Sequence, residues 1–168
     1  TYTVSDGEGG TSTATLDITV TPVDDQVNLG GLGDGNDGSD DNHVSDGSVS
    51  EAGLPGGSDE GNGLIHSGSF TLGPADSLAS FTLGSRSISL AELEASASSP
   101  IAIEGRYGTL TIEGYDRATG TVSYRYLLTS NADHANEPVS DDFMISVTDV
   151  EGEVTANAGT LVIDIDDD

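Results

Sequence analysis

Acidic side chains gather beside the ends of predicted strands, and carboxylates in that arrangement could bind a hard divalent cation. One group is the pair Asp24 and Asp25, a second lies in the turn from Asp149 to Glu153, and a third occupies positions 166–168. Calcium binds about six to eight oxygen ligands, mainly from carboxylates and carbonyls. These residues therefore predict calcium binding, and solvated turn acids that bind no ion are the alternative.

Strand order predicts which acids meet. In a sandwich of alternating strands, the turn between the last two strands returns to the end where the chain enters, and the turn at 115–120 reaches the same end. The predicted calcium ligands at this entry joint are Asp24, Asp25, Asp116, Asp149, Glu151 and Glu153. The loop 130–142 is expected at the exit, where the predicted ligands are Asp133, Asp141, Asp166, Asp167 and Asp168. Ligands shared across a joint between domains would stiffen it.

The Gly- and Asp-rich stretch at 30–46 is a further acidic loop. Position twelve counted from Asp34 is Ser45, where an EF-hand has a bidentate Glu. Gly35 stands where the calcium-binding nonapeptide has Asp. A calcium loop of another kind and a plain linker both stay open for this stretch, and the loop at 56–63 is a weaker candidate of the same sort.

No motif for catalysis emerges. The three histidines, His43, His66 and His134, lie outside any G-x-S-x-G or H-E-x-x-H pattern. Glycoside hydrolysis needs a carboxylic acid with a raised pKa in an apolar cleft, and no apolar loop is available to build one. We therefore predict that the protein is not an enzyme.

Composition limits the partners. The chain has Asp+Glu 30 against Lys+Arg 4, a net charge of −26, so nucleic acid and acidic membranes are excluded as partners. Such self-repulsion opposes folding unless cations or high salt neutralise it, and the clustering of the acids favours cations. Because the chain has no cysteine, it can form neither disulfides nor thiolate metal sites. No apolar run reaches the roughly 18 residues of a membrane span, so membrane insertion is not expected.

The elements that would position these acids are strands. Apolar residues alternate with polar ones, which gives each strand one buried and one exposed face; the patterned segments are 16–20, 79–83, 110–112, 122–128, 143–147 and 161–165. Tyr124 and Tyr126 fall on a buried face. The pattern predicts an all-β fold, an Ig-like antiparallel β-sandwich. One short helix is expected over Leu90–Ala97, ending before Pro100.

The beginning of the chain repeats its end. The turn at Asp6 matches the turn at Asp149, 143 positions later, since 149 − 6 = 143. An offset of this size is typical of tandem domains. We predict that residues 1–24 are the last hairpin of a preceding repeat, and that residues 25–168 form a complete one. The apolar side chains of Leu16, Ile18 and Val20 would then be covered by another copy of the chain or exposed where a domain was cut.

The residues also resemble a known family. VSEAGLPGGSD at 49–59, YGTLTI at 107–112, GTVSY at 120–124, VTD at 147–149 and LVIDIDD at 161–167 are similar to the roughly 143-residue repeats of giant type I secreted, RTX-type adhesins of Gram-negative bacteria. The likeness covers residues 27–168. YTVSDGEGG at 2–10 with ITVTPVD at 18–24 looks like the end of a related cadherin-like or Ig-like repeat. The acidic stretch at 33–41 departs from the pattern.

The resemblance implies an extracellular extender domain on the bacterial cell surface, in cell adhesion and biofilm formation. Family members bind Ca²⁺ at their joints, where the matching positions here are Asp24 and Asp25, the turn 149–152 and the exit 166–168. The expected partners are neighbouring repeats of the same polypeptide, with self-association as a further option. A carbohydrate-binding module is an alternative hypothesis, although the chain has no tryptophan to stack on sugars. A homophilic adhesive domain is a second alternative.

Overall fold

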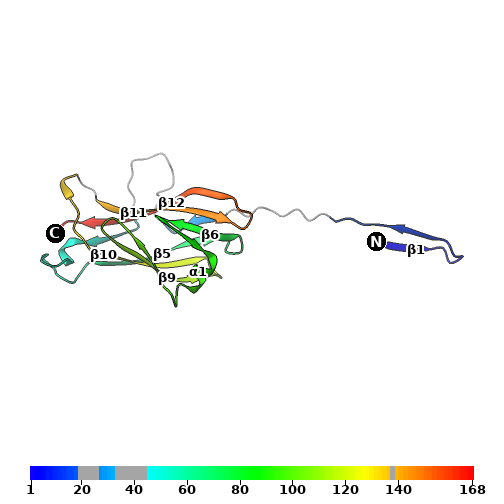
Figure 1. The fold of residues 1–168 in the computed structure, drawn as a ribbon, viewed down its shortest axis with the longest axis horizontal. Helices are drawn as coiled ribbons and strands as arrows, with labels where there is room; N and C mark the ends of the chain where they lie inside the picture. The colour runs from blue at the N-terminus through cyan, green and yellow to red at the C-terminus, as the bar shows by residue number, and fades with distance from the viewer. Residues whose placement is uncertain (19–26, 33–44, 137–138) are drawn as a thin grey trace.

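Most of the chain forms a two-layered β-sandwich, preceded by a separate hairpin (Figure 1). The structure is a computed structural model and describes residues 1–18, 27–32, 45–136 and 139–168. The hairpin pairs β1 (Tyr2–Ser5) with β2 (Thr11–Ala14). Sheet I of the sandwich has the order β3 (Asn28–Gly30), β5 (Ile65–Gly73), β10 (Thr121–Leu128), β9 (Gly108–Asp116), β8 (Ile101–Glu104). Sheet II has the order β4 (Gly47–Ser50), β12 (Val154–Asp166), β11 (Ser140–Asp149), β6 (Leu78–Leu83), β7 (Arg86–Ser89).

The predicted all-β sandwich with one short helix is confirmed. One ladder differs from the expected antiparallel arrangement, because β4 pairs with β12 in parallel, with Val49 opposite Ile165. β4 lies in sheet II, whereas its neighbours along the chain, β3 and β5, lie in sheet I. No hairpin therefore joins β4 to its partner β12, and parallel pairing is possible. All other described ladders are antiparallel.

Inward-facing side chains from both sheets fill the core. The alternation read from the sequence holds along β10, where Val122, Tyr124 and Tyr126 are all buried, as predicted for the two tyrosines. Phe70 of sheet I packs edge-on against Phe81 of sheet II, with ring centroids 6.3 Å apart. Further side chains with 0% exposure complete the core: Leu72, Leu78, Leu83, Ile88, Leu93, Leu110, Ile112, Ile145, Leu161 and Ile163.

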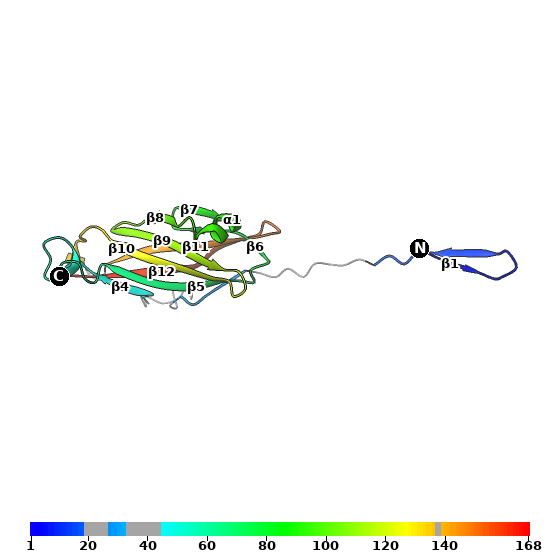
Figure 2. The same cartoon turned by 90° about the horizontal axis from the view of Figure 1, so that it is seen from below.

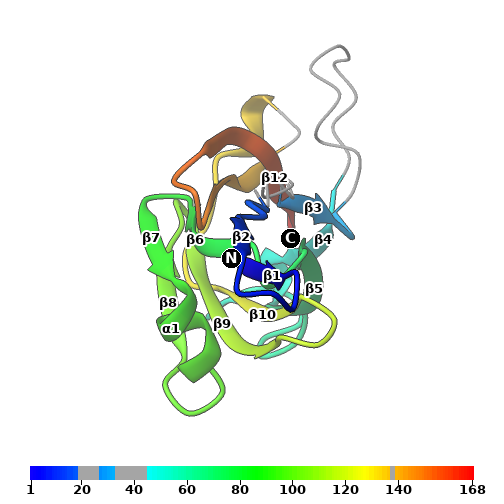
Figure 3. The same ribbon diagram turned by 90° about the vertical axis from the view of Figure 1, so that its right-hand side faces the viewer.

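The helix α1 (Leu90–Ala95) carries the chain from the edge strand β7 of one sheet to the edge strand β8 of the other (Figure 3). Its start is fixed by a capping box, in which Ser89 accepts from the N–H of Glu92 and the Glu92 carboxylate accepts from the N–H of Ser89. Leu93 points into the core. The helix ends two residues before the predicted end at Ala97.

The sandwich has two poles (Figure 2). We call the end with the start of β3 and the turns 73–77, 116–121 and 149–153 the entry pole. The exit pole contains the 3-10 helix η1 (Glu51–Gly53) with the loop after it, the described part of the segment 129–139 with η2 (His134–Asn136), and the end of β12 at 166–168. The chain therefore enters the sandwich at one pole and leaves it at the other.

The N-terminal hairpin differs from its prediction. The second strand was expected at 16–20, but it lies at Thr11–Ala14, opposite β1. Leu16 and Ile18 are 67% and 75% exposed, and Val20 lies outside the described residues. The turn at 6–10 sets the register so that Tyr2 opposes Ala14, and β1 offers no further residues with which Leu16 and Ile18 could pair.

Candidate functional site

Both acidic turns predicted for the entry joint, at 116–120 and 149–153, border the turn after β5 at one end of the sandwich. The N–H of Val150 donates to the carbonyl of Ser77 at 2.9 Å, which fixes the 149–153 turn against the turn after β5. The turn at 117–120 shares a surface hollow with 73–76, and Asn28 at the start of β3 pairs with Gly73. Strand parity thus placed these turns correctly. Asp24 and Asp25, the linker part of the predicted site, lie outside the described residues.

Two of the entry acids support their own turns. The N–H of Glu153 donates to Oδ1 of Asp149 at 2.8 Å, and the N–H of Ala118 donates to Oδ1 of Asp116 at 2.9 Å. Each bond occupies one oxygen of a group that has two, so both carboxylates keep lone pairs for a cation. Asp149 is 6% exposed, whereas Asp116, Glu151 and Glu153 are open to solvent.

At the exit pole, most predicted ligands are exposed turn acids. Asp133 accepts from the N–H of Ala135 at 3.1 Å, and Asp168 accepts from the N–H of Ser58 at 3.0 Å. The second bond ties the end of the described chain to the loop after η1. Asp166 and Asp167 are also exposed.

Asp141 has a different environment from the other predicted ligands. It is 2% exposed, and its two oxygens accept from the backbone N–H groups of Arg106, Tyr107 and Gly108 and from the hydroxyl of Tyr126 at 2.6 Å. Burial, together with this bond to Asp141, raises the pKa of Tyr126 far above that of an ordinary tyrosine. Asp141 therefore holds the turn between β8 and β9, a role that the sequence did not suggest.

Among the described residues, three side chains at the exit pole converge more closely than any predicted set of ligands. One potential ligand atom each from Glu51, His134 and Asp167 lies within 4.8 Å of the others. Among the residues that the structure describes, no other group of three or more histidines and acids has its potential ligand atoms this close together. Sequence reasoning selected Asp167 but missed Glu51 and His134, because no spacing along the chain links η1, η2 and the end of β12.

Glu51 and His134 are both deeply buried, with side chains 4% and 8% exposed. Oε1 of Glu51 lies 3.3 Å from Nε2 of His134 and also accepts from the N–H of Ala132. Arginines pair elsewhere: Arg86 with Glu92, Arg117 with Glu94, and Arg125 with Glu113, while Arg106 stacks on Tyr107. The cluster of Glu51, His134 and Asp167, here called the exit triad, therefore carries net negative charge when the imidazole is neutral.

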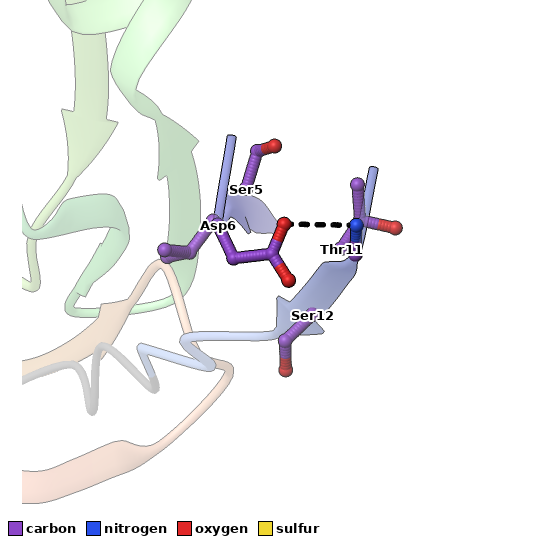
Figure 4. A pocket seen from close by; sticks show the side chains of 6 residues that line it. Ser5, Asp6, Thr11 and Ser12 are labelled. Atoms are coloured by element: carbon purple, nitrogen blue, oxygen red, sulfur yellow. Dashed lines mark hydrogen bonds between the residues drawn. The ribbon is translucent and has the colours of Figure 1, made fainter. Parts of the chain in front are cut away.

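The hairpin turn at 6–10 shares two hydrogen bonds with the 149–153 turn. Oδ1 of Asp6 accepts from the N–H of Gly10 at 2.9 Å (Figure 4). The N–H of Asp6 donates to the carbonyl of Gly10. The backbone bond from Glu8, followed by that from Gly10, lowers the pKa of Asp6 below the usual aspartate value. Asp149 and Glu153 make the same pair of bonds 143 positions later.

The aromatic residues do not form an exposed platform on the sandwich. Tyr124 and Tyr126 lie in the core, and burial together with the charge of Asp46 raises the pKa of Tyr124 to about 12. Tyr107 and Tyr115 are half-buried. Stacking on sugars needs exposed ring faces, which the buried rings of Tyr124 and Tyr126 do not present.

Comparisons with protein-family models, curated proteins and solved structures found no match to this chain. Among the described residues, no helix is long and apolar enough to span a membrane.

Proposed function

We propose that the protein is a calcium-binding extracellular spacer domain of a bacterial surface adhesin, and that calcium stiffens its joints with neighbouring repeats. The observation that carries the proposal is the placement of the chain's entry and exit at opposite poles of the sandwich, each with acidic side chains. Tandem copies of such a domain extend in a line rather than fold back on one another. The spacing of copies would then depend on how rigid each joint is.

Recurrence of a similar hairpin turn 143 positions apart supports a tandem arrangement. The turns at Asp6 and Asp149 share two hydrogen bonds, and a glycine with positive φ stands three residues after each aspartate, Gly9 at 98° and Gly152 at 88°. Two domains of one architecture in succession would each end in this hairpin. The 149–153 turn lies at the pole where β3 begins, which is the end at which the described chain enters the sandwich.

The charge of the chain supports calcium as the stiffening agent. A net charge of −26 opposes close approach of two such domains, and a divalent cation held by both would reverse that repulsion locally. Carboxylates are the ligands that calcium prefers, and the entry pole presents Asp116, Glu151 and Glu153 to solvent.

Thermal unfolding of the chain in EDTA and in rising free calcium tests the proposal. A cation that binds only the folded state raises the melting temperature, and each tenfold rise in free calcium above the dissociation constant adds about 1.4 kcal/mol for each site. Sodium chloride at equal ionic strength separates binding from screening. Identical melting curves in EDTA and in millimolar calcium would contradict the proposal.

A matched pair of variants locates the effect. Glu151→Gln, in the turn at the entry pole, should reduce the calcium-induced rise in melting temperature. Glu8→Gln removes the same charge from the equivalent position of the hairpin turn, since 151 − 8 = 143, and should leave the rise unchanged. An equal loss in both variants would mean that the effect comes from overall charge and not from a site at the joint.

A further inference from the structure

We propose that the exit triad binds a divalent transition-metal ion, with zinc as the ion to test. Zinc lies about 2.0 to 2.2 Å from nitrogen and oxygen ligands, and tetrahedral geometry then separates two ligands by roughly 3.4 Å. Nε2 of His134 and Oε1 of Glu51 are 3.3 Å apart. The third ligand atom, from Asp167, lies within 4.8 Å of the other two, so a small rotation of this exposed side chain completes the site.

Burial distinguishes this cluster from the surface acids around it. Removing a carboxylate from water costs several kcal/mol unless a positive group compensates it. Glu51 is 4% exposed and a second carboxylate, that of Asp167, lies beside it. The arginine ion pairs lie with other acids on the sheets and the helix, and the chain has no lysine. A bound dication supplies the compensating charge.

The imidazole decides which metal fits. Calcium and magnesium take oxygen ligands, whereas imidazole nitrogen suits zinc, copper, nickel and iron. His134 is 8% exposed and faces both carboxylates of the cluster, so a cation bound there contacts nitrogen. The exit triad is therefore a different kind of site from the calcium joint proposed above, and its existence does not depend on that joint.

The three ligands come from segments that are far apart in the sequence. Glu51 lies in η1 after β4, His134 lies in η2 between β10 and β11, and Asp167 follows β12. A metal ion bound to all three would fasten both exit loops to the last strand. Binding to the folded state alone would stabilise the whole domain by mass action.

Calorimetric titration of zinc into the EDTA-treated and dialysed chain tests the site. We expect one equivalent to bind. Since loss of an outer-sphere partner typically costs about 10- to 100-fold in metal affinity, loss of a direct ligand in His134→Gln or Glu51→Gln should cost at least as much. His66→Gln, a histidine of β5 outside the cluster, is the matched control and should bind as the wild type does. Asp167→Asn should weaken binding, and Asp166→Asn, with the same change of charge, should not.

A measurement on the unaltered chain keeps the test decisive if a variant fails to fold. The chain has three histidines, and imidazole nitrogen resonances report metal ligation directly. One equivalent of zinc should shift the ring nitrogens of His134 alone and should remain bound in millimolar calcium. Absence of zinc binding, or a shift at His43 or His66 without one at His134, would leave a buried Glu51–His134 ion pair as the correct description and overturn the proposal. A missing calcium response in the zinc-free melting experiment would overturn the spacer mechanism and leave this result untouched.

Discussion

The hairpins β1–β2 and β11–β12 have similar turns, but their strands differ in how far they are buried. Both turns contain an aspartate that binds the N–H of the residue four positions later. Residues 1–18 are nevertheless all exposed, whereas Ile145 and Val147 of β11 are 0% and 1% exposed. Similar local sequences, DGEGG at 6–10 and DVEGE at 149–153, thus give similar turns with or without a sandwich, while burial of the strands requires the second sheet.

This difference separates local from tertiary sources of stability. A turn is closed by bonds among five neighbouring residues, which form wherever the backbone can adopt the geometry. A lone two-stranded hairpin is marginally stable in water because its apolar side chains stay hydrated. The hairpins therefore provide a natural pair in which equivalent positions, 143 residues apart, can be changed one at a time.

The largest loss of stability is expected from substitution of Asp141. This buried residue of β11 accepts hydrogen bonds from another turn, and the β1–β2 hairpin has no equivalent among the described residues. Asp141→Ala leaves three backbone N–H groups and the Tyr126 hydroxyl without their buried acceptor. Since each such bond to a charged group contributes roughly 1.5 to 3 kcal/mol, we expect the free energy of unfolding in urea to fall by about 3 kcal/mol or more. Asp142→Ala, at the exposed neighbouring position, is the control. Equal losses in the two variants would contradict the structural role of Asp141.

A smaller effect is expected at the paired valines. Val147 is 1% exposed and Val4, 143 positions earlier, is 61% exposed. Val147→Ala should lower the free energy of unfolding by about 2 kcal/mol through lost burial and the cavity that remains. Val4→Ala should change it by no more than about 0.5 kcal/mol. A comparable loss at Val4 would show that the hairpin is covered in solution, and sedimentation would then reveal whether a second copy of the chain covers it.

The smallest effect concerns the turn of the exposed hairpin. Because the folded pKa of Asp6 is lowered, its bonds are fully present above the ordinary aspartate pKa and are lost as the pH falls through the lowered value. The amide resonance of Gly10 should follow this titration in NMR spectra and should lose it in Asp6→Asn. A midpoint at the ordinary value of about 3.9 would mean that the turn does not form without a sandwich around it.

Much of the fold follows from patterns that local physics enforces. Alternation along 122–128 places Val122, Tyr124 and Tyr126 on one face of β10. Strand parity brings the turns at Asp116 and Asp149 to one pole without any knowledge of sheet order. The start of the helix was also predicted correctly. The helix ends two residues earlier than predicted, because helix ends commonly fray.

Pairing partners were harder to predict. Alternation at 16–20 indicated a strand, but the described residues 16–18 of this segment are unpaired, because β1 ends its pairing at Tyr2–Ala14. The parallel pairing of β4 with β12 likewise depends on which segments the closed sandwich brings together. Neither outcome is encoded within a short window of sequence.

The two acidic turns, the buried strand faces and the poles could be predicted from residue order, because hydrogen bonds among near neighbours and a period of two need no distant contact. Which acids became buried depended on tertiary packing. Asp141 lies under the 105–108 turn and Glu51 lies against His134 because loops from both sheets close over the same end. Solvent exclusion arises from the packing of segments far apart in the chain, and so an acid that reads like its neighbours in the sequence can have a wholly different role in the fold.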